Sequence, residues 1–156
     1  MPPIFGILNT TLQPVDPEMI RRMKEAAVYV KPREIFSNEI PGAFLAASAV
    51  KENPLVPGRD TLIFEDNWIL VADMSLYKKK ELIDELLRPE DQKTRRPEDQ
   101  KTLSDASLLM MSWKKWGKDC VRHLYGDFAF VIFNTQTGDI FCGRDHLGVR
   151  PLFFTF

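Results

Sequence analysis

The residue types that most often perform chemistry are sparse in this sequence. It holds two cysteines, Cys120 and Cys142, and two histidines, His123 and His146. None of the four has a cysteine or histidine partner at metal-ligand spacing, so no metal site is expected. We interpret the cysteines as small, buried, reduced residues in preference to a disulfide, and this favours a cytoplasmic location.

The opening stretch MPPIFGIL raises another kind of chemistry, because some hydrolases use the first residue of the chain as their nucleophile. Pro2 carries neither a thiol nor a hydroxyl. Loss of Met1 would expose the secondary amine of Pro2, which could serve as a base or nucleophile. Thr10 and Thr11 offer hydroxyls, but only cleavage of the leading apolar run would make either of them N-terminal.

The bulk composition limits the classes of function. The chain has 156 residues, 44% of them hydrophobic, which is enough for one domain with a substantial core. Its 21 basic and 22 acidic residues balance, so the composition does not favour nucleic acid or an anionic membrane as a partner. No stretch has the length of a membrane span, and no signal peptide is visible at the N-terminus.

The first third of the sequence predicts a strand, a helix and further strands. An apolar run at 4–9 predicts the first strand. Asp16 is a suitable N-cap with Pro17 behind it, and apolar residues at helical spacing, Met19 and Met23 among them, predict a helix that lies on a sheet. Runs rich in β-branched and aromatic residues then predict strands at 43–50, 60–66 and 67–73.

The middle of the chain combines a helix with an exact repeat. The segment 78–88 predicts a helix with a buried side formed by Leu82, Ile83, Leu86 and Leu87. The sequence RPEDQKT then occurs twice, at 88–94 and 96–102. Residues 88–102 therefore predict a mobile charged surface loop, interpreted as a tolerated duplication in preference to a docking segment.

The last third predicts a covered strand. A helix is expected from Ser104 to about Trp116, then a break at Gly117 and a second short helix that ends at Gly126. Two strands joined by the turn TQTGD follow. The first of them, in DFAFVIF, has apolar residues on both faces, so both faces should be buried. Helices with one apolar face and strands with both faces buried together predict two stacked sheets with helices outside, a four-layer arrangement.

Three stretches of the sequence, which occur in the same order as in the family, resemble one family. The stretch from SDASLLMM to GVRPLFF, the segment NWILVADMSLYKKKELIDEL and the start MPPIFGIL are similar to the glutaminase domain of asparagine synthetase and its relatives. These are class II glutamine amidotransferase domains of the N-terminal-nucleophile (Ntn) type. The resemblance is closest at 104–154, looser at 66–87 and weakest at 32–60. It implies an α+β fold, a four-layer αββα sandwich over residues 1–156.

The same resemblance implies that the catalytic residue is missing. Active members of the family hydrolyse glutamine with an N-terminal cysteine, whose own amino group acts as the base. The cysteine position corresponds to Pro2. The family's Asn-Gly-Glu corresponds to Asp73-Met74-Ser75. In the family the Asn side chain and the Gly amide form the oxyanion hole, whereas here an ionised Asp73 offers an acceptor in place of a donor and Met74 adds bulk.

The remaining pocket residues match in part. No arginine occurs between Gly42 and Gly58 to clamp a substrate carboxylate; only Lys51 does. Asp105 matches the aspartate that meets the substrate amine, but we interpret it as a helix cap in preference to that role. The block containing Arg144, Asp145, Gly148 and Arg150 also matches the family, and we interpret these residues as fixing a turn and an interdomain contact.

The sequence thus predicts a non-hydrolysing glutaminase-like domain of an asparagine-synthetase-like amide ligase. The degenerate pocket resembles the branch that holds β-lactam synthetases and lasso-peptide cyclases. Their ATP- and Mg-dependent ligase domain has a pyrophosphate loop that this sequence lacks, so no cofactor is expected here. The alternatives are a glutaminase or amidase with a non-cysteine nucleophile, and a stand-alone binding or regulatory domain.

The last prediction concerns the C-terminal run PLFFTF. The resemblance implies one more strand after it, so we interpret the sequence as a fragment, a single domain or half of a split enzyme that lacks its last strand. PLFFTF would then be an exposed sheet edge. We expect docking to a ligase domain or partner chain, or assembly into a homo-oligomer.

Overall fold

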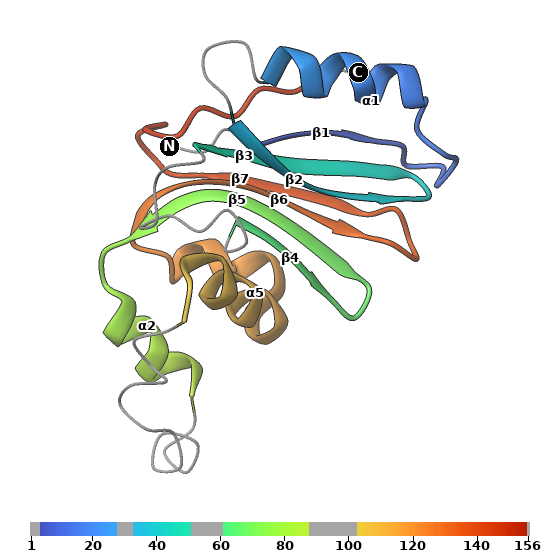
Figure 1. Cartoon of the computed structure of the whole chain (residues 1–156). Coiled ribbons are helices and arrows are strands. Elements are labelled where there is room, and N and C mark those ends of the chain that lie inside the picture. Colours follow the sequence, from blue (N-terminus) through green and yellow to red (C-terminus); the bar gives the residue numbers. More distant parts are fainter. Residues whose placement is uncertain (1–3, 28–32, 51–60, 88–102, 156) are drawn as a thin grey trace.

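The computed structural model describes residues 4–27, 33–50, 61–87 and 103–155. Within these ranges it contains two antiparallel sheets and three α-helices (Figure 1). This mixed architecture agrees with the expected α+β class. Pro2 and both copies of the RPEDQKT repeat, and with them the loop predicted at 88–102, lie outside the described residues.

The first sheet has three strands in the order β1-β3-β2. β1 (Ile4–Leu8) and β3 (Ala43–Val50) confirm the strands predicted there. β2 (Arg33–Ile40) was not predicted, because charged and polar residues interrupt its apolar pattern. The turn between β2 and β3 requires Gly42, which has a φ of +79°.

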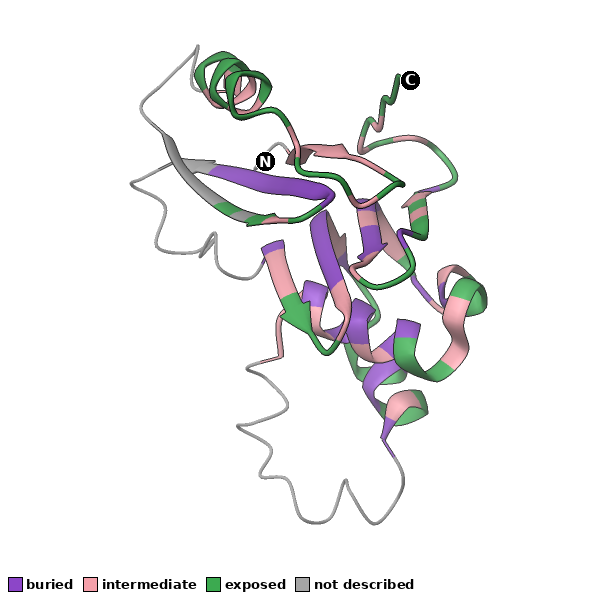
Figure 2. Ribbon diagram, turned by 90° about the vertical axis from the view of Figure 1, so that its right-hand side faces the viewer, coloured by how far each residue is buried: buried purple, intermediate pink, exposed green. Residues whose placement is uncertain are grey.

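The second sheet has four strands in sequence order, β4 (Leu62–Glu65), β5 (Trp68–Leu76), β6 (Gly126–Asn134) and β7 (Ile140–Arg144). β6 is buried on both faces, as predicted. Phe128, Phe130 and Ile132 join the core beneath the helices, whereas Phe133 joins β3 and β5 in a second core between the two sheets. Figure 2 shows these buried strands at the centre of the molecule.

Two helices cover the outer face of the second sheet. α5 (Asp105–Trp116) packs on β5, and α2 (Lys79–Leu86) packs on α5. The break at Gly117 is confirmed, with a φ of +56°. The following segment is a 3-10 helix, η2 (Gly117–Arg122), and it ends before Gly126, where β6 already begins.

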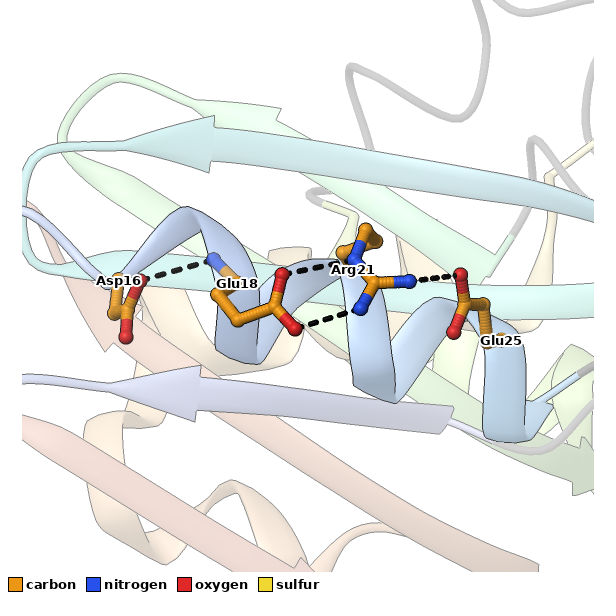
Figure 3. Close-up of polar contacts among 4 residues, drawn as sticks. All are labelled: Asp16, Glu18, Arg21 and Glu25. Atoms are coloured by element: carbon orange, nitrogen blue, oxygen red, sulfur yellow. Dashed lines mark hydrogen bonds and ion pairs between the residues drawn. The ribbon is translucent and has the colours of Figure 1, made fainter.

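α1 (Pro17–Ala27) begins where the cap predicted it. Asp16 Oδ1 accepts a hydrogen bond from the Glu18 backbone N–H at 2.9 Å. On the exposed side of the helix, the Arg21 guanidinium pairs with both Glu18 and Glu25 (Figure 3). These surface pairs support the helix itself but contribute little to its attachment to the sheet.

α1 lies near the first sheet without a buried residue of its own. The prediction that Met19 faces the sheet is wrong, since this side chain is 52% exposed. Lys24 attaches the helix instead, through an ion pair with Glu39 at 2.5 Å and a position over the Phe44 ring. A cavity of about 550 Å³ remains between α1 and the β2–β3 turn, lined mainly by prolines and aliphatic residues.

Two further expectations are corrected. Cys142 is exposed on β7, so only Cys120 is a buried cysteine; both are free. Residues 151–155 form no strand, and Phe153 and Phe154 are 90% and 77% exposed. Separately, none of the described helices is long and apolar enough to cross a membrane.

Candidate functional site

The candidate site lies at one end of the second sheet. The register places Asp73 of β5 opposite Ala129 of β6, and Ala129 opposite Arg144 of β7. Asp73 continues the alternation of Ile69 and Val71, whose side chains form the core between the two sheets. Its side chain therefore lies on the sheet face that looks toward the first sheet.

Asp73 forms an ion pair with Arg150. The Arg150 Nη1 atom lies 3.4 Å from Asp73 Oδ1, and the two side chains are only 12% and 11% exposed. Burial raises the pKa of the Asp73 carboxyl, while the Arg150 charge counteracts that rise. Within the described part of the chain, the buried Nε and Nη1 atoms of Arg150 form no hydrogen bond. The ion pair is their principal compensation.

Asp145 holds the loop that delivers Arg150. Its carboxylate accepts hydrogen bonds from four backbone N–H groups, those of Phe128, Leu147, Val149 and Arg150, at 2.9 to 3.3 Å. Burial alone would raise the pKa of this carboxyl, but the four donors outweigh it and lower the pKa to about 2. Asp145 is therefore ionised, and its carboxylate holds the loop in place.

The same loop needs its glycine. Gly148 has a φ of +64°, a conformation that side chains rarely adopt, and its N–H donates to the Asp145 backbone carbonyl at 3.1 Å. A Cβ atom at Gly148 would lie 3.5 Å from Cζ of Arg144, so the Arg144 guanidinium lies close to this turn. Asp145 and Gly148 together shape the connection after β7.

The Met74 side chain lies on the opposite face of β5 from the side chains of Asp73 and Ser75. It packs against the core beneath α5. The expectation that Met74 adds bulk to the pocket is therefore wrong, because strand alternation turns its side chain away. Ser75, which stands opposite Asp127 in the register, alternates back to the Asp73 side and is partly buried.

Asp105 connects a helix to a strand end. Its Oδ2 atom accepts a hydrogen bond from the Leu76 backbone N–H at 3.2 Å, and its Oδ1 atom lies 2.5 Å from Lys79 Nζ. The helix cap is Ser104, whose Oγ accepts from the Ser107 N–H at 3.1 Å. The preferred interpretation of Asp105 as the cap is therefore wrong; its carboxylate joins α5 to β5 and α2.

Sequence reasoning missed two polar residues at this end of the sheet. The Tyr77 hydroxyl donates to Asp127 Oδ2, and this bond raises the pKa of Tyr77. The Tyr77 N–H also donates to the Tyr125 carbonyl at 2.9 Å, and both tyrosine side chains are about 60% exposed. Nothing in their spacing indicated this, because the contacts join segments far apart in sequence.

The other candidate groups lie outside this site. His123 pairs with Glu85 at 2.8 Å and stacks on Trp116, so it belongs to the helical layer. Thr11 is exposed, and its hydroxyl donates to Asn9 at 2.6 Å. Among the described residues, no three histidine, cysteine or acidic side chains gather as a metal site would require.

Comparison with known proteins gives a consistent family. A model described as "Glutamine amidotransferase domain" matches residues 35–156. Asparagine synthetase (glutamine-hydrolysing) 3 of Bacillus subtilis is 34% identical over 90 residues, which cover 58% of this chain and 14% of that protein. Asparagine synthetase (glutamine-hydrolysing) 1 of the same organism is 28% identical over 144 residues, covering 88% of this chain and 21% of its own length. The chain thus spans about a fifth or less of these relatives.

Proposed function

The chain belongs to the glutamine amidotransferase domain family, and from this premise we propose that it is a member that does not hydrolyse glutamine. Its role is structural, within an asparagine-synthetase-like, ATP-dependent amide ligase. In this member the fold is retained and the reaction is lost.

The Asp73–Arg150 pair is the observation that carries the proposal. An oxyanion hole needs hydrogen-bond donors directed at the developing negative charge. An ionised Asp73 presents only acceptors at the position where the resemblance implies an asparagine donor. Arg150 is already engaged with that carboxylate at 3.4 Å. A negative charge on a reacting glutamine would meet a carboxylate here.

Two other residues support the loss of activity. The sequence has Pro2 at the nucleophile position, and proline has no side-chain group that can attack an amide. Asp105, the residue that would meet the substrate amine, already serves Leu76 and Lys79. The acidic groups of the site are therefore committed to contacts within the protein.

We base the layer arrangement and the branch of the family on the sequence resemblance. We place the domain as a four-layer αββα sandwich in the branch that includes β-lactam synthetases and lasso-peptide cyclases, whose amine substrates do not come from glutamine. A ligase domain or partner chain would bind ATP and Mg, and this chain would bind neither. The block from Arg144 to Arg150 would then contact that partner.

The direct test is ammonia release from L-glutamine by the purified chain. Intact mass first establishes the N-terminal residue, and a glutamine-hydrolysing asparagine synthetase serves as the positive control. We expect the chain to release no more ammonia than buffer does. Release above that background would contradict the proposal, and its loss in Thr11→Ala or after blocking of the N-terminal amine would identify the alternative nucleophile.

A second observation tests the proposed parent enzyme. If the domain serves an amide ligase, the adjoining or neighbouring reading frame should encode a domain with a pyrophosphate loop of the type S-G-G-x-D-S. That domain should bind this chain when the two are produced together. A neighbourhood without such a domain would favour the stand-alone binding or regulatory role.

A further inference from the structure

The cavity between α1 and the β2–β3 turn has the size and the lining of a small-ligand site. Its volume of about 550 Å³ lies within the range of about 300 to 1,000 Å³ that is usual for such sites. Most of its lining is apolar and includes Pro14, Pro17 and Pro41. Proline has a fixed φ and no backbone N–H, so these parts of the wall are stiff and offer no donor to a polar group. The body of a ligand that fits here is therefore apolar.

The packing of α1 leaves room for such a ligand. No residue of α1 is buried, although the helix lies over the first sheet (Figure 1). Ile20 of α1 and Ile40 of β2 both line the cavity and are only partly buried. An apolar group between them would remove more of both side chains from water, and it would give α1 an apolar contact with the sheet.

The charges of the cavity come from two residues that pair with each other. Of the described residues that line it, three are charged: Arg21, Lys24 and Glu39. Arg21 is already satisfied, because each of its three side-chain nitrogen atoms donates to Glu18 or Glu25, at 2.5 to 2.8 Å (Figure 3). Lys24 and Glu39 form an ion pair at 2.5 Å. The cavity thus presents one positive and one negative charge side by side.

The Lys24–Glu39 pair has capacity for a further partner. An ammonium group carries three N–H donors, and within the described contacts Lys24 directs one of them at Glu39 Oε1. The same contacts leave the second oxygen of Glu39 without a hydrogen bond. The two side chains are 35% and 51% exposed, so their pairing is weak and they can shift toward a ligand at little cost.

We propose that this cavity binds a free α-amino acid with an apolar side chain. The carboxylate of the ligand pairs with Lys24, its ammonium group pairs with Glu39, and its side chain lies against the prolines and the two isoleucines. Charge complementarity selects this class of ligand. An apolar carboxylic acid would bring its negative charge beside Glu39, and an apolar amine would bring its positive charge beside Lys24. A zwitterion meets an opposite charge at both places.

The cavity is separate from the Asp73–Arg150 pair. Figure 1 and Figure 2 both place α1 on the face of the first sheet that turns away from the second sheet. Asp73 and Arg150 belong to the second sheet and to the loop after it. Binding at the cavity therefore does not depend on whether the domain hydrolyses glutamine.

NMR titration of the ¹⁵N-labelled chain with L-leucine and with L-phenylalanine tests the proposal. We expect saturable shifts of the amides in α1 and in the β2–β3 turn with at least one of the two. For the amino acid that binds more tightly, the acid without its amino group and the amine without its carboxylate each keep the side chain and one charge. L-Serine keeps both charges without an apolar side chain. Each of these three compounds should bind at least about tenfold more weakly.

Variants of the two charged residues test each contact. Lys24→Met and Glu39→Gln should both raise the dissociation constant of the amino acid at least about tenfold. In Glu39→Gln the acid without the amino group should bind at least as tightly as the amino acid, because no carboxylate repels it; a merely structural effect would weaken both alike. Glu25→Gln is the matched control on the exposed side of α1, where Glu25 pairs with Arg21, and it should leave the dissociation constant unchanged.

Three results would overturn the proposal. The first is the absence of a saturable shift with either amino acid at about 10 mM, which corresponds to no useful affinity. The second is a set of shifts confined to the surroundings of Asp73 and Arg150. The third is binding that the single-charge compounds match, or that Lys24→Met and Glu39→Gln leave intact.

Discussion

Arg150, on the loop after β7, reaches within 3.4 Å of Asp73 on β5, and both side chains are nearly buried. This contact joins the loop after β7 to β5, one of the two central strands of the second sheet. Asp145 makes the contact possible, because its carboxylate fixes the backbone of Arg150 itself at 3.1 Å. The block that we interpreted from the sequence as a turn thus also supplies the cation that pairs with Asp73.

Removal of the Arg150 charge should destabilise the domain. Arg150→Met keeps the unbranched, apolar part of the side chain but leaves the Asp73 carboxylate buried without its partner, at a cost of about 2 to 4 kcal/mol in the free energy of unfolding. Urea denaturation measures this cost. The double variant Asp73→Leu/Arg150→Met should recover most of the loss, and a double variant no more stable than the single one would show that the pair is not coupled.

Asp145 should give the domain a stability that depends on acid pH. Its pKa in the folded state, about 2, lies below the usual value of 3.8, so its contribution is complete above pH 3.8. That contribution is lost as the pH falls from 3.8 toward 2, because the unfolded chain takes up the proton first. Denaturant midpoints measured across this range should fall less steeply in Asp145→Asn.

The same variant should be less stable at neutral pH, by about 2 to 3 kcal/mol, because an amide replaces a charged acceptor of four backbone hydrogen bonds. His146→Asn is the matched control, since the neighbouring side chain is exposed. Equal losses in the two variants would contradict the role given to Asp145.

Asp105 should act on stability and not on glutamine binding. Asp105→Ala removes the acceptor of the Leu76 N–H and the partner of Lys79, at a cost of about 1 to 3 kcal/mol. Lys79→Met should cost less, because this lysine is about half exposed. Calorimetric titration with glutamine should show no binding before or after the change; binding that Asp105→Ala abolishes would restore Asp105 to a substrate role.

α1 should be the least stable of the three described helices. None of its residues is buried, whereas six residues of α5 are. Local openings expose the helices with fewest buried contacts first, so amides of α1 should exchange with deuterium at least about tenfold faster than those of α5. Lys24→Met should accelerate exchange in α1, because it removes the charge that pairs with Glu39 and lies over the Phe44 ring.

The sequence predicted the local elements better than the contacts between them. The double apolar pattern of β6 and the break at Gly117 are local signals, and the structure confirms both. The prediction for Met19 was wrong because the orientation of α1 on the first sheet decides which of its residues face that sheet. Cys142 was misplaced for a similar reason: burial of an edge strand depends on what lies beside it.

In the candidate site, too, the sequence predicted single residues better than the contacts between them. The resemblance located Asp73, Asp105 and the block around Arg150, but not that Asp73 and Arg150 meet. The role predicted for Met74 was wrong, because side chains alternate along β5 and that of Met74 lies on the opposite face from Asp73. Tyr77 and Asp127 gave no local signal, and only the pairing of β5 with β6 brings them together.

The central claim is that the domain retains the fold without glutamine hydrolysis. The most direct measurement follows glutamine labelled with ¹⁵N at its amide by NMR in the presence of the intact chain. The account predicts that the amide signal keeps its intensity and line width, with no ammonium signal growing in. Steady conversion of the amide signal to ammonium, faster than in buffer, would contradict it.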